Sequence, residues 1–125
     1  MIDAQKNNEP LDLSYLREMA GDSPEFIIEM IDLFKQQTPA YIEELQSAVA
    51  AKDWSRVAAS AHKIKPTFTY VGRADAKTYM QWIETSAKEG SDLDRLPAAI
   101  QEISAFTEIL YAQLDKTRSE LQRQL

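Results

Sequence analysis

Apolar residues between positions 54 and 71 recur at steps that alternate between three and four without a break. These residues are Trp54, Val57, Ala61, Ile64, Phe68 and Val71. Such spacing places one continuous apolar stripe along the side of a helix. A stripe of this length has to be covered by neighbouring helices. The segment therefore predicts one member of a helical bundle, with Gly72 ending the helix.

The rest of the chain from Leu11 onward also has helical periodicity. We expect further helices over about residues 14–20, 24–51 and 74–88, and from about 94 into the C-terminus. Ser23 and Asp53 are of the residue types that cap helix N-termini, and Pro24 fits the first helical position. Pro39 should kink the helix over 24–51 or split it in two, because proline removes one backbone hydrogen bond.

The breaks between the predicted long helices are short, which forces consecutive helices to be antiparallel neighbours. Only three glycines and five prolines occur in 125 residues, and this favours long helices over a turn-rich β fold. We therefore predict an all-α fold, an antiparallel up-and-down four-helix bundle with a short extra N-terminal helix. Its core should include Trp54, Val57, Ile64, Phe68, Met80, Ile83, Ile100 and Ile103.

The domain organisation follows from the same pattern. Residues 1–10 are polar and predict a flexible or loosely docked N-terminus, while residues 11–125 form a single domain. The tail after about Lys116 should fray. The initial methionine and the lack of a linker favour a free-standing protein over an excised domain.

The composition narrows the classes of partner and site. The net charge of −6 and the pI of about 4.8, without a cluster of Lys or Arg, argue against nucleic acid and anionic membranes as partners. No cysteine is present, which excludes disulfides and thiolate metal sites. No apolar run approaches the roughly 20 residues of a membrane span. We expect a soluble, cytoplasmic protein.

His62 is the only histidine of the chain, and it lies one step past the apolar stripe. Small residues at Ser55, Ala58 and Ala59 should leave an open strip leading to its imidazole, which should point to solvent. Gly72 follows His62 by ten residues, and a similar distance down the next helix reaches Glu84. Glu84 should therefore lie across from the imidazole, on the outer face of its helix.

A lone surface histidine usually has no function, and the position of His62 alone would favour that interpretation. Lysines such as Lys65, which should lie near Gln81, are likewise most often solvated charges. A di-iron site would need paired Glu-x-x-His motifs, and the chain has a single histidine. No nucleophile elbow and no glycine-rich phosphate loop are present, which argues against a serine hydrolase and against an ATP-dependent kinase.

The stretch from Ala61 to Gly72, Ala-His-Lys-Ile-Lys-Pro-Thr-Phe-Thr-Tyr-Val-Gly, resembles the signature of histidine phosphotransfer (HPt) domains. That signature is Ala-His-x-Leu-Lys-Gly, followed by a glycine ten residues after the histidine. The flanking segments are also similar, and the resemblance covers roughly residues 13–90. It implies that His62 is phosphorylated, that Lys65 is the cation beside it and that Gly72 is the helix-ending glycine.

One position departs from the HPt pattern. Pro66 stands where the family has glycine after the lysine. Proline in a helix interior costs on the order of 3 kcal/mol, and its missing N–H would have bonded the carbonyl of His62. We expect a kink centred on the reactive residue, which bears on the imidazole geometry and on the choice of partner.

The implied chemistry suits these residues. Free imidazole titrates near pH 6.5, so an exposed ring is mostly neutral and nucleophilic at cytoplasmic pH. Lys65 can offset the charge of about −1.5 to −2 on a phosphoryl group. Glu84 could accept a hydrogen bond from the other ring nitrogen and so fix the tautomer, or it could be a solvated charge.

The resemblance also implies the partners. We expect a monomer that exchanges phosphate with response-regulator receiver domains, including that of a hybrid sensor histidine kinase, and that needs no cofactor because the receiver supplies Mg²⁺. Two alternatives stay open: a module that binds receivers without carrying phosphate, and an unrelated helical adaptor. The expected docking strip consists of Ser55, Ala58, Ala59, His62, Lys65, Pro66 and Thr69, with Gln81 and Glu84 at its rim.

Overall fold

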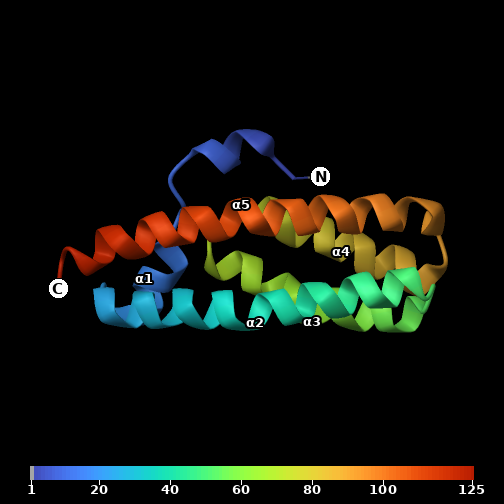
Figure 1. The fold of residues 1–125 in the computed structure, drawn as a ribbon, viewed down its shortest axis with the longest axis horizontal. Coiled ribbons are helices and arrows are strands. Elements are labelled where there is room, and N and C mark those ends of the chain that lie inside the picture. The colour runs from blue at the N-terminus through green and yellow to red at the C-terminus, as the bar shows by residue number, and fades with distance from the viewer. Residues whose placement is uncertain (1) are drawn as a thin grey trace.

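The computed structural model describes residues 2–125, and its long elements are all helices (Figure 1). The four long helices are α2 (Pro24–Ala50), α3 (Trp54–Tyr70), α4 (Ala74–Glu89) and α5 (Leu96–Gln122). The shorter elements are the helix α1 (Ser14–Ala20) and the 3-10 turns η1 (Ala4–Asn8) and η2 (Leu93–Arg95). None of the residues from 2 to 125 lies in a strand, which confirms the all-α prediction.

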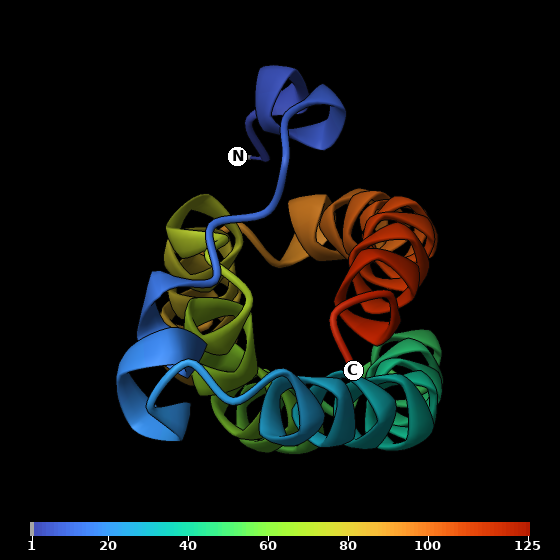
Figure 2. The same ribbon diagram turned by 90° about the vertical axis from the view of Figure 1, so that its left-hand side faces the viewer.

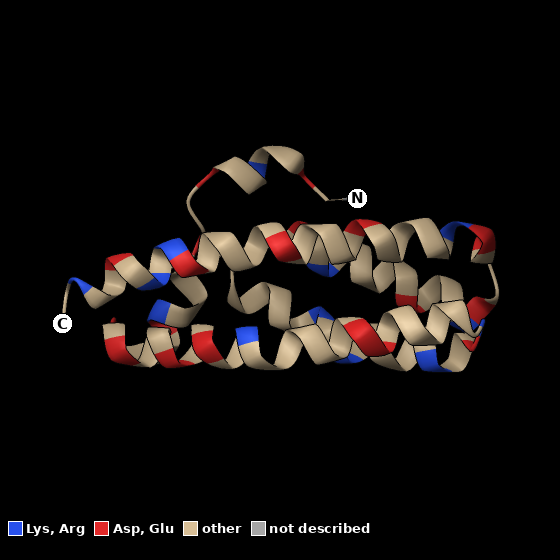
Figure 3. Cartoon of the chain, viewed as in Figure 1, with Lys and Arg blue, Asp and Glu red and all other residues tan. Residues whose placement is uncertain are grey.

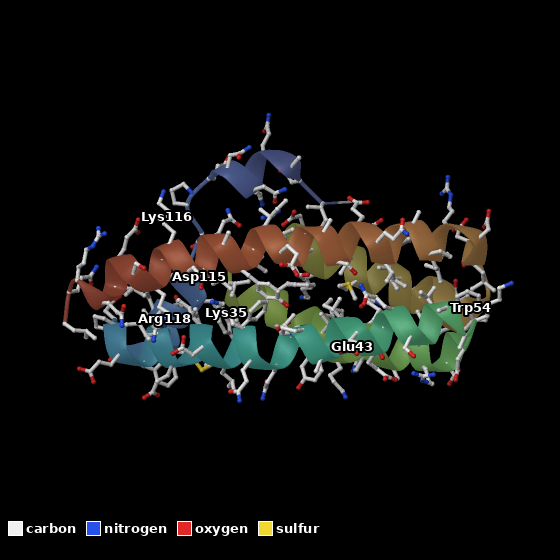
Figure 4. The ribbon with its side chains drawn as sticks, in the orientation of Figure 1. Lys35, Glu43, Trp54, Asp115, Lys116 and Arg118 are labelled. Carbon is white, nitrogen blue, oxygen red and sulfur yellow. The ribbon has the colours of Figure 1, made fainter. Side chains whose placement is uncertain are left out.

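The four long helices lie around a common axis, as the end view shows (Figure 2), and their buried apolar side chains form one core. The hairpin of α3 and α4 has the most extensive contacts, followed by the pairs α2–α5 and α2–α3. Seven of the eight residues predicted for the core are buried. Trp54 is only half-buried, because it is the first residue of α3 and lies at one end of the bundle (Figure 4).

Local signals define where α2 and α3 begin. The Ser23 hydroxyl accepts a hydrogen bond from the backbone of Phe26 at 3.4 Å, and the Asp53 carboxylate accepts one from Arg56 at 3.2 Å. Both residues are therefore N-caps, as predicted. Pro39 does not split α2, which continues without interruption to Ala50. The packing of one long apolar face against α3 and α5 outweighs the single lost hydrogen bond.

We expected the C-terminal helix to fray after Lys116, and this expectation is wrong. Helix α5 continues to Gln122, with Leu121 buried. The Arg118 Nε atom lies 2.7 Å from the Asp32 Oδ1 atom of α2, and Lys35 of α2 pairs with Asp115 (Figure 4). These contacts along α2 hold the last turns of α5 in place.

Residues 3–9 fold back over α4 and α5. Arg73, 2% exposed, donates to Asp75, to the Asn7 side chain and to the Asp3 carbonyl. Gln113 of α5 donates to backbone carbonyls of the same N-terminal segment. The segment is thus docked on the bundle, and the flexibility predicted for residues 1–10 stays a prediction; Met1 lies outside the described residues.

Charged residues of both signs are interspersed along the helices in the view of Figure 3. No helix within residues 2–125 is both long enough and apolar enough to cross a membrane.

Candidate functional site

His62 lies in the middle of α3, one position past the buried Ala61. Its side chain is 68% exposed, as the sequence predicts. The position is set by the apolar stripe, which turns Ala61 and Ile64 into the core and leaves the next residue at the surface. The imidazole is therefore accessible to another molecule.

Glu84 of α4 lies directly across from the imidazole. Its Oε2 atom is 3.0 Å from the Nδ1 atom of His62, so the predicted juxtaposition is confirmed. The expectation that Glu84 faces outward is wrong: the residue is only 4% exposed. Helices α3 and α4 form the most extensive helix pair of the bundle, and the Glu84 carboxylate lies between them, in contact with His62 and Lys65 of α3.

Two lysines hold the buried carboxylate. The Lys65 Nζ atom lies 2.9 Å from Glu84 Oε1 and 2.7 Å from Gln81 Oε1, which places Gln81 next to Lys65 as predicted. The Lys88 Nζ atom lies 3.0 Å from Glu84 Oε2, the oxygen that also contacts His62. Both carboxylate oxygens are therefore satisfied, as a buried charge requires.

These contacts decide the protonation of Glu84. Burial by itself raises the pKa of the carboxyl, but hydrogen bonds from Lys65, Lys88 and His62 outweigh it and lower the pKa to about 2. An ionised carboxylate can only accept hydrogen bonds. The Nδ1 atom of the imidazole must therefore be the donor, which leaves Nε2 with a free lone pair when the ring is neutral.

The predicted docking strip is mostly exposed around His62. Ser55, Ala59, Pro66 and Gln81 are exposed, and Thr69 is half-buried. Ala58 is 4% exposed, so its place on an open strip is wrong. Its methyl group lines a hollow between α3 and α4. This hollow is formed by Ser55, Ala58, Ala59, His62, Ala87 and Lys88.

Gly72 lies just after α3, where the chain passes close to the backbone of Asp12. Its φ is +76°, and a Cβ atom there would lie 2.1 Å from the backbone oxygen of Asp12. Only glycine fits both conditions. Helix α3 includes Pro66 and continues to Tyr70, so proline does not end it. The kink expected at His62 stays a prediction.

Sequence reasoning gave Lys88 no role. The signal for its contact was present, because Lys88 follows Glu84 by four residues and such pairs meet on one helix face.

Among residues 2–125, no group of three His, Asp or Glu side chains could hold a metal ion. The polar cluster of His62, Lys65, Gln81, Glu84 and Lys88 is thus organised around the imidazole.

Comparisons with known proteins agree with this arrangement. A family profile described as "Hpt domain" matches residues 29–124. The fold is similar to that of histidine-containing phosphotransfer protein B (HptB) from Pseudomonas aeruginosa PAO1, with a TM-score of 0.65, 23% identity and coverage of 94% of this chain and 95% of that chain.

A second solved structure with the same fold is the HPT domain of the Hpt sensor hybrid histidine kinase from Shewanella. It has a TM-score of 0.60, 21% identity and coverage of 91% of this chain and 92% of that chain. No curated protein sequence matches the chain. The profile match spans most of the sequence, and the chain therefore belongs to the Hpt domain family, whose members take part in histidine phosphotransfer in two-component signalling.

Proposed function

We propose that this chain is a phosphorelay intermediate in which His62 accepts a phosphoryl group from a phospho-aspartyl receiver domain and passes it to another receiver. The observation that carries the proposal is the exposed imidazole whose Nδ1 atom lies 3.0 Å from a buried carboxylate. Such a ring has a fixed orientation and a free Nε2 atom, which is what a reversible phosphoryl acceptor needs.

The transfer step follows from this tautomer. The Nε2 lone pair attacks the phosphorus atom of the aspartyl phosphate, a nitrogen–phosphorus bond forms, and the bond to the aspartate oxygen breaks. The bonding electrons leave with the aspartate, which becomes a carboxylate. The Nδ1 proton stays on the ring, and the positive charge that develops there is stabilised by Glu84. The reverse sequence returns the group to a second receiver.

Everything else that the reaction needs comes from the partner. We infer that the receiver supplies Mg²⁺ and the acidic pocket, that a hybrid sensor histidine kinase can provide such a receiver, and that this chain acts as a monomer without a cofactor. Phosphoryl transfer depends mainly on positioning and charge neutralisation, and a rigid helix supports both. The exposed residues Ser55, Ala59, Pro66 and Gln81 offer a docking surface around His62.

Incubation with a phosphorylated receiver domain tests this function. The wild-type chain should acquire acid-labile phosphate, and His62→Gln should acquire none while keeping its helical circular dichroism, because an exposed side chain contributes little to packing. The chain with ATP and Mg²⁺ alone should not become labelled. A His62→Gln chain that still accepts phosphate would place the site elsewhere. A wild-type chain that binds receivers without labelling would be an interaction module.

A further inference from the structure

The two lysines next to Glu84 are held in different ways. Lys65 contacts two acceptors, Gln81 and Glu84, and its side chain is only 17% exposed. Lys88 contacts Glu84 alone and its side chain is 62% exposed. Lys65 is therefore fixed between α3 and α4, whereas Lys88 can leave the carboxylate without losing contact with solvent.

The hollow beside His62 is lined by Lys88 and not by Lys65. Its apolar lining consists of the alanines Ala58, Ala59 and Ala87, and its polar groups are the Ser55 hydroxyl, the His62 imidazole and the Lys88 ammonium. Lys88 is the only charged side chain among the lining residues. A small anion attached to the imidazole on this side would meet Lys88 first.

The polar cluster around His62 carries an excess positive charge in the unphosphorylated chain. One carboxylate, Glu84, faces two ammonium groups, Lys65 and Lys88, so one positive charge is in excess when the imidazole is neutral. A phosphoryl group brings a charge of about −1.5 to −2 and three acceptor oxygens. If Lys88 turns to these oxygens, Glu84 still keeps Lys65 and the Nδ1–H of His62 as donors.

We propose that the hollow is the binding site of the phosphoryl group on His62, and that Lys88 rather than Lys65 contacts the phosphoryl oxygens. Lys65 is then a positioning residue that acts through Glu84. The proposal rests on the proposed function, because it takes the phosphoryl group on His62 as given. It departs from the role that the HPt resemblance implies for Lys65.

Nuclear magnetic resonance of the lysine Nζ groups tests this division of roles directly. Potassium phosphoramidate is the probe, because it phosphorylates histidine without a receiver domain. On phosphorylation of the wild-type chain, the Lys88 signal should shift, and the signals of Lys65 and of the distant control Lys77 should change little. A shift of Lys65 with an unchanged Lys88 would overturn the proposal.

Variants give a second measurement. In equilibrium with a receiver, Lys88→Gln should lower the share of phosphate on His62 about threefold, the modest effect of an exposed ion pair. Lys65→Gln should instead shift the ring nitrogen resonances of His62 before phosphorylation. Lys77 lies on the same face of α4 as Lys88, about 16 Å along the helix from it at 1.5 Å per residue. Lys77→Gln should therefore change neither the share of phosphate on His62 nor the ring nitrogen resonances.

The outcomes separate this inference from the proposed function. A wild-type chain that takes no phosphoryl group from phosphoramidate or from a receiver refutes the proposed function itself. A chain that is phosphorylated on His62, but in which Lys88→Gln has the same transfer equilibrium as wild type, refutes only the role of Lys88.

Discussion

Replacing Glu84 with Gln tests whether the buried carboxylate is held in its charged form by its neighbours. Glutamine keeps the shape and can still accept a hydrogen bond from the imidazole, but it carries no charge. The pKa of Glu84 lies at about 2 instead of 4.5. The difference of about 2.5 pH units corresponds to at most roughly 3.4 kcal/mol of folding free energy. Lys88 is largely exposed, and water screens its contribution, so we expect about 1–2 kcal/mol at pH 7.

The sign of the pH dependence follows from the direction of the shift. The folded-state pKa of Glu84 is below its ordinary value, so the stabilisation is fully present above about pH 4.5 and is lost as the pH falls from there through 2. The glutamine variant has no such titration. The difference in unfolding free energy between wild type and Glu84→Gln should therefore be largest at neutral pH and shrink in acid.

Urea unfolding followed by circular dichroism at several pH values between 7 and 2.5 measures this difference. Glu29→Gln is the matched control, because Glu29 is exposed on α2, and its variant should stay within about 0.5 kcal/mol of wild type. A Glu84→Gln deficit that is the same at pH 2.5 as at pH 7 would refute the reasoning, because the loss could not then come from the charge.

Two further substitutions test the docking surface and the fold. Ala59→Glu should slow phosphotransfer about a hundredfold, because a displacement of 1 Å at the reacting atoms has that effect. The control Gln101→Glu, on the exposed side of α5, should transfer at the wild-type rate. Equal transfer rates for the two variants would contradict the position of the docking strip. Gly72→Ala should cost at least about 2 kcal/mol of unfolding free energy in urea, because its Cβ atom would overlap Asp12. Gly21→Ala, with positive φ but open space, should cost only about 1 kcal/mol, and an equal loss in both would show that the overlap is relieved.

Sequence reasoning located the elements well because their signals are local. The caps at Ser23 and Asp53 depend on neighbouring residues, and the apolar stripe depends on spacing alone. Counting residues on both sides of Gly72 also placed Glu84 opposite His62, because two antiparallel helices joined by a tight turn have a fixed register.

The errors arose where helix rotation and long-range packing decide the outcome. The register of the hairpin gives the position of Glu84 along the helix axis. The burial of Glu84 depends instead on the rotation of α4 about its axis relative to α3, and the burial of Ala58 depends on the same packing. The last turns of α5 are ordered by Asp32, which is 86 residues away from Arg118 in the sequence. Neither effect can be inferred from residues that are close along the chain.

The arrangement of charges around His62 suits a carrier that must give its phosphate away again. A phosphoryl group enclosed by several fixed cations would be bound too tightly to leave, because each buried charge-assisted hydrogen bond contributes about 1.5–3 kcal/mol. Here the imidazole is 68% exposed, the fixed Lys65 is already engaged by Glu84 and Gln81, and the available Lys88 is itself solvated. Under the roles proposed above, the buried part of the cluster orients the ring in both states, and the exposed part stabilises the phosphate only modestly. Such a division keeps the free energies of the free and phosphorylated forms close, which allows transfer in either direction.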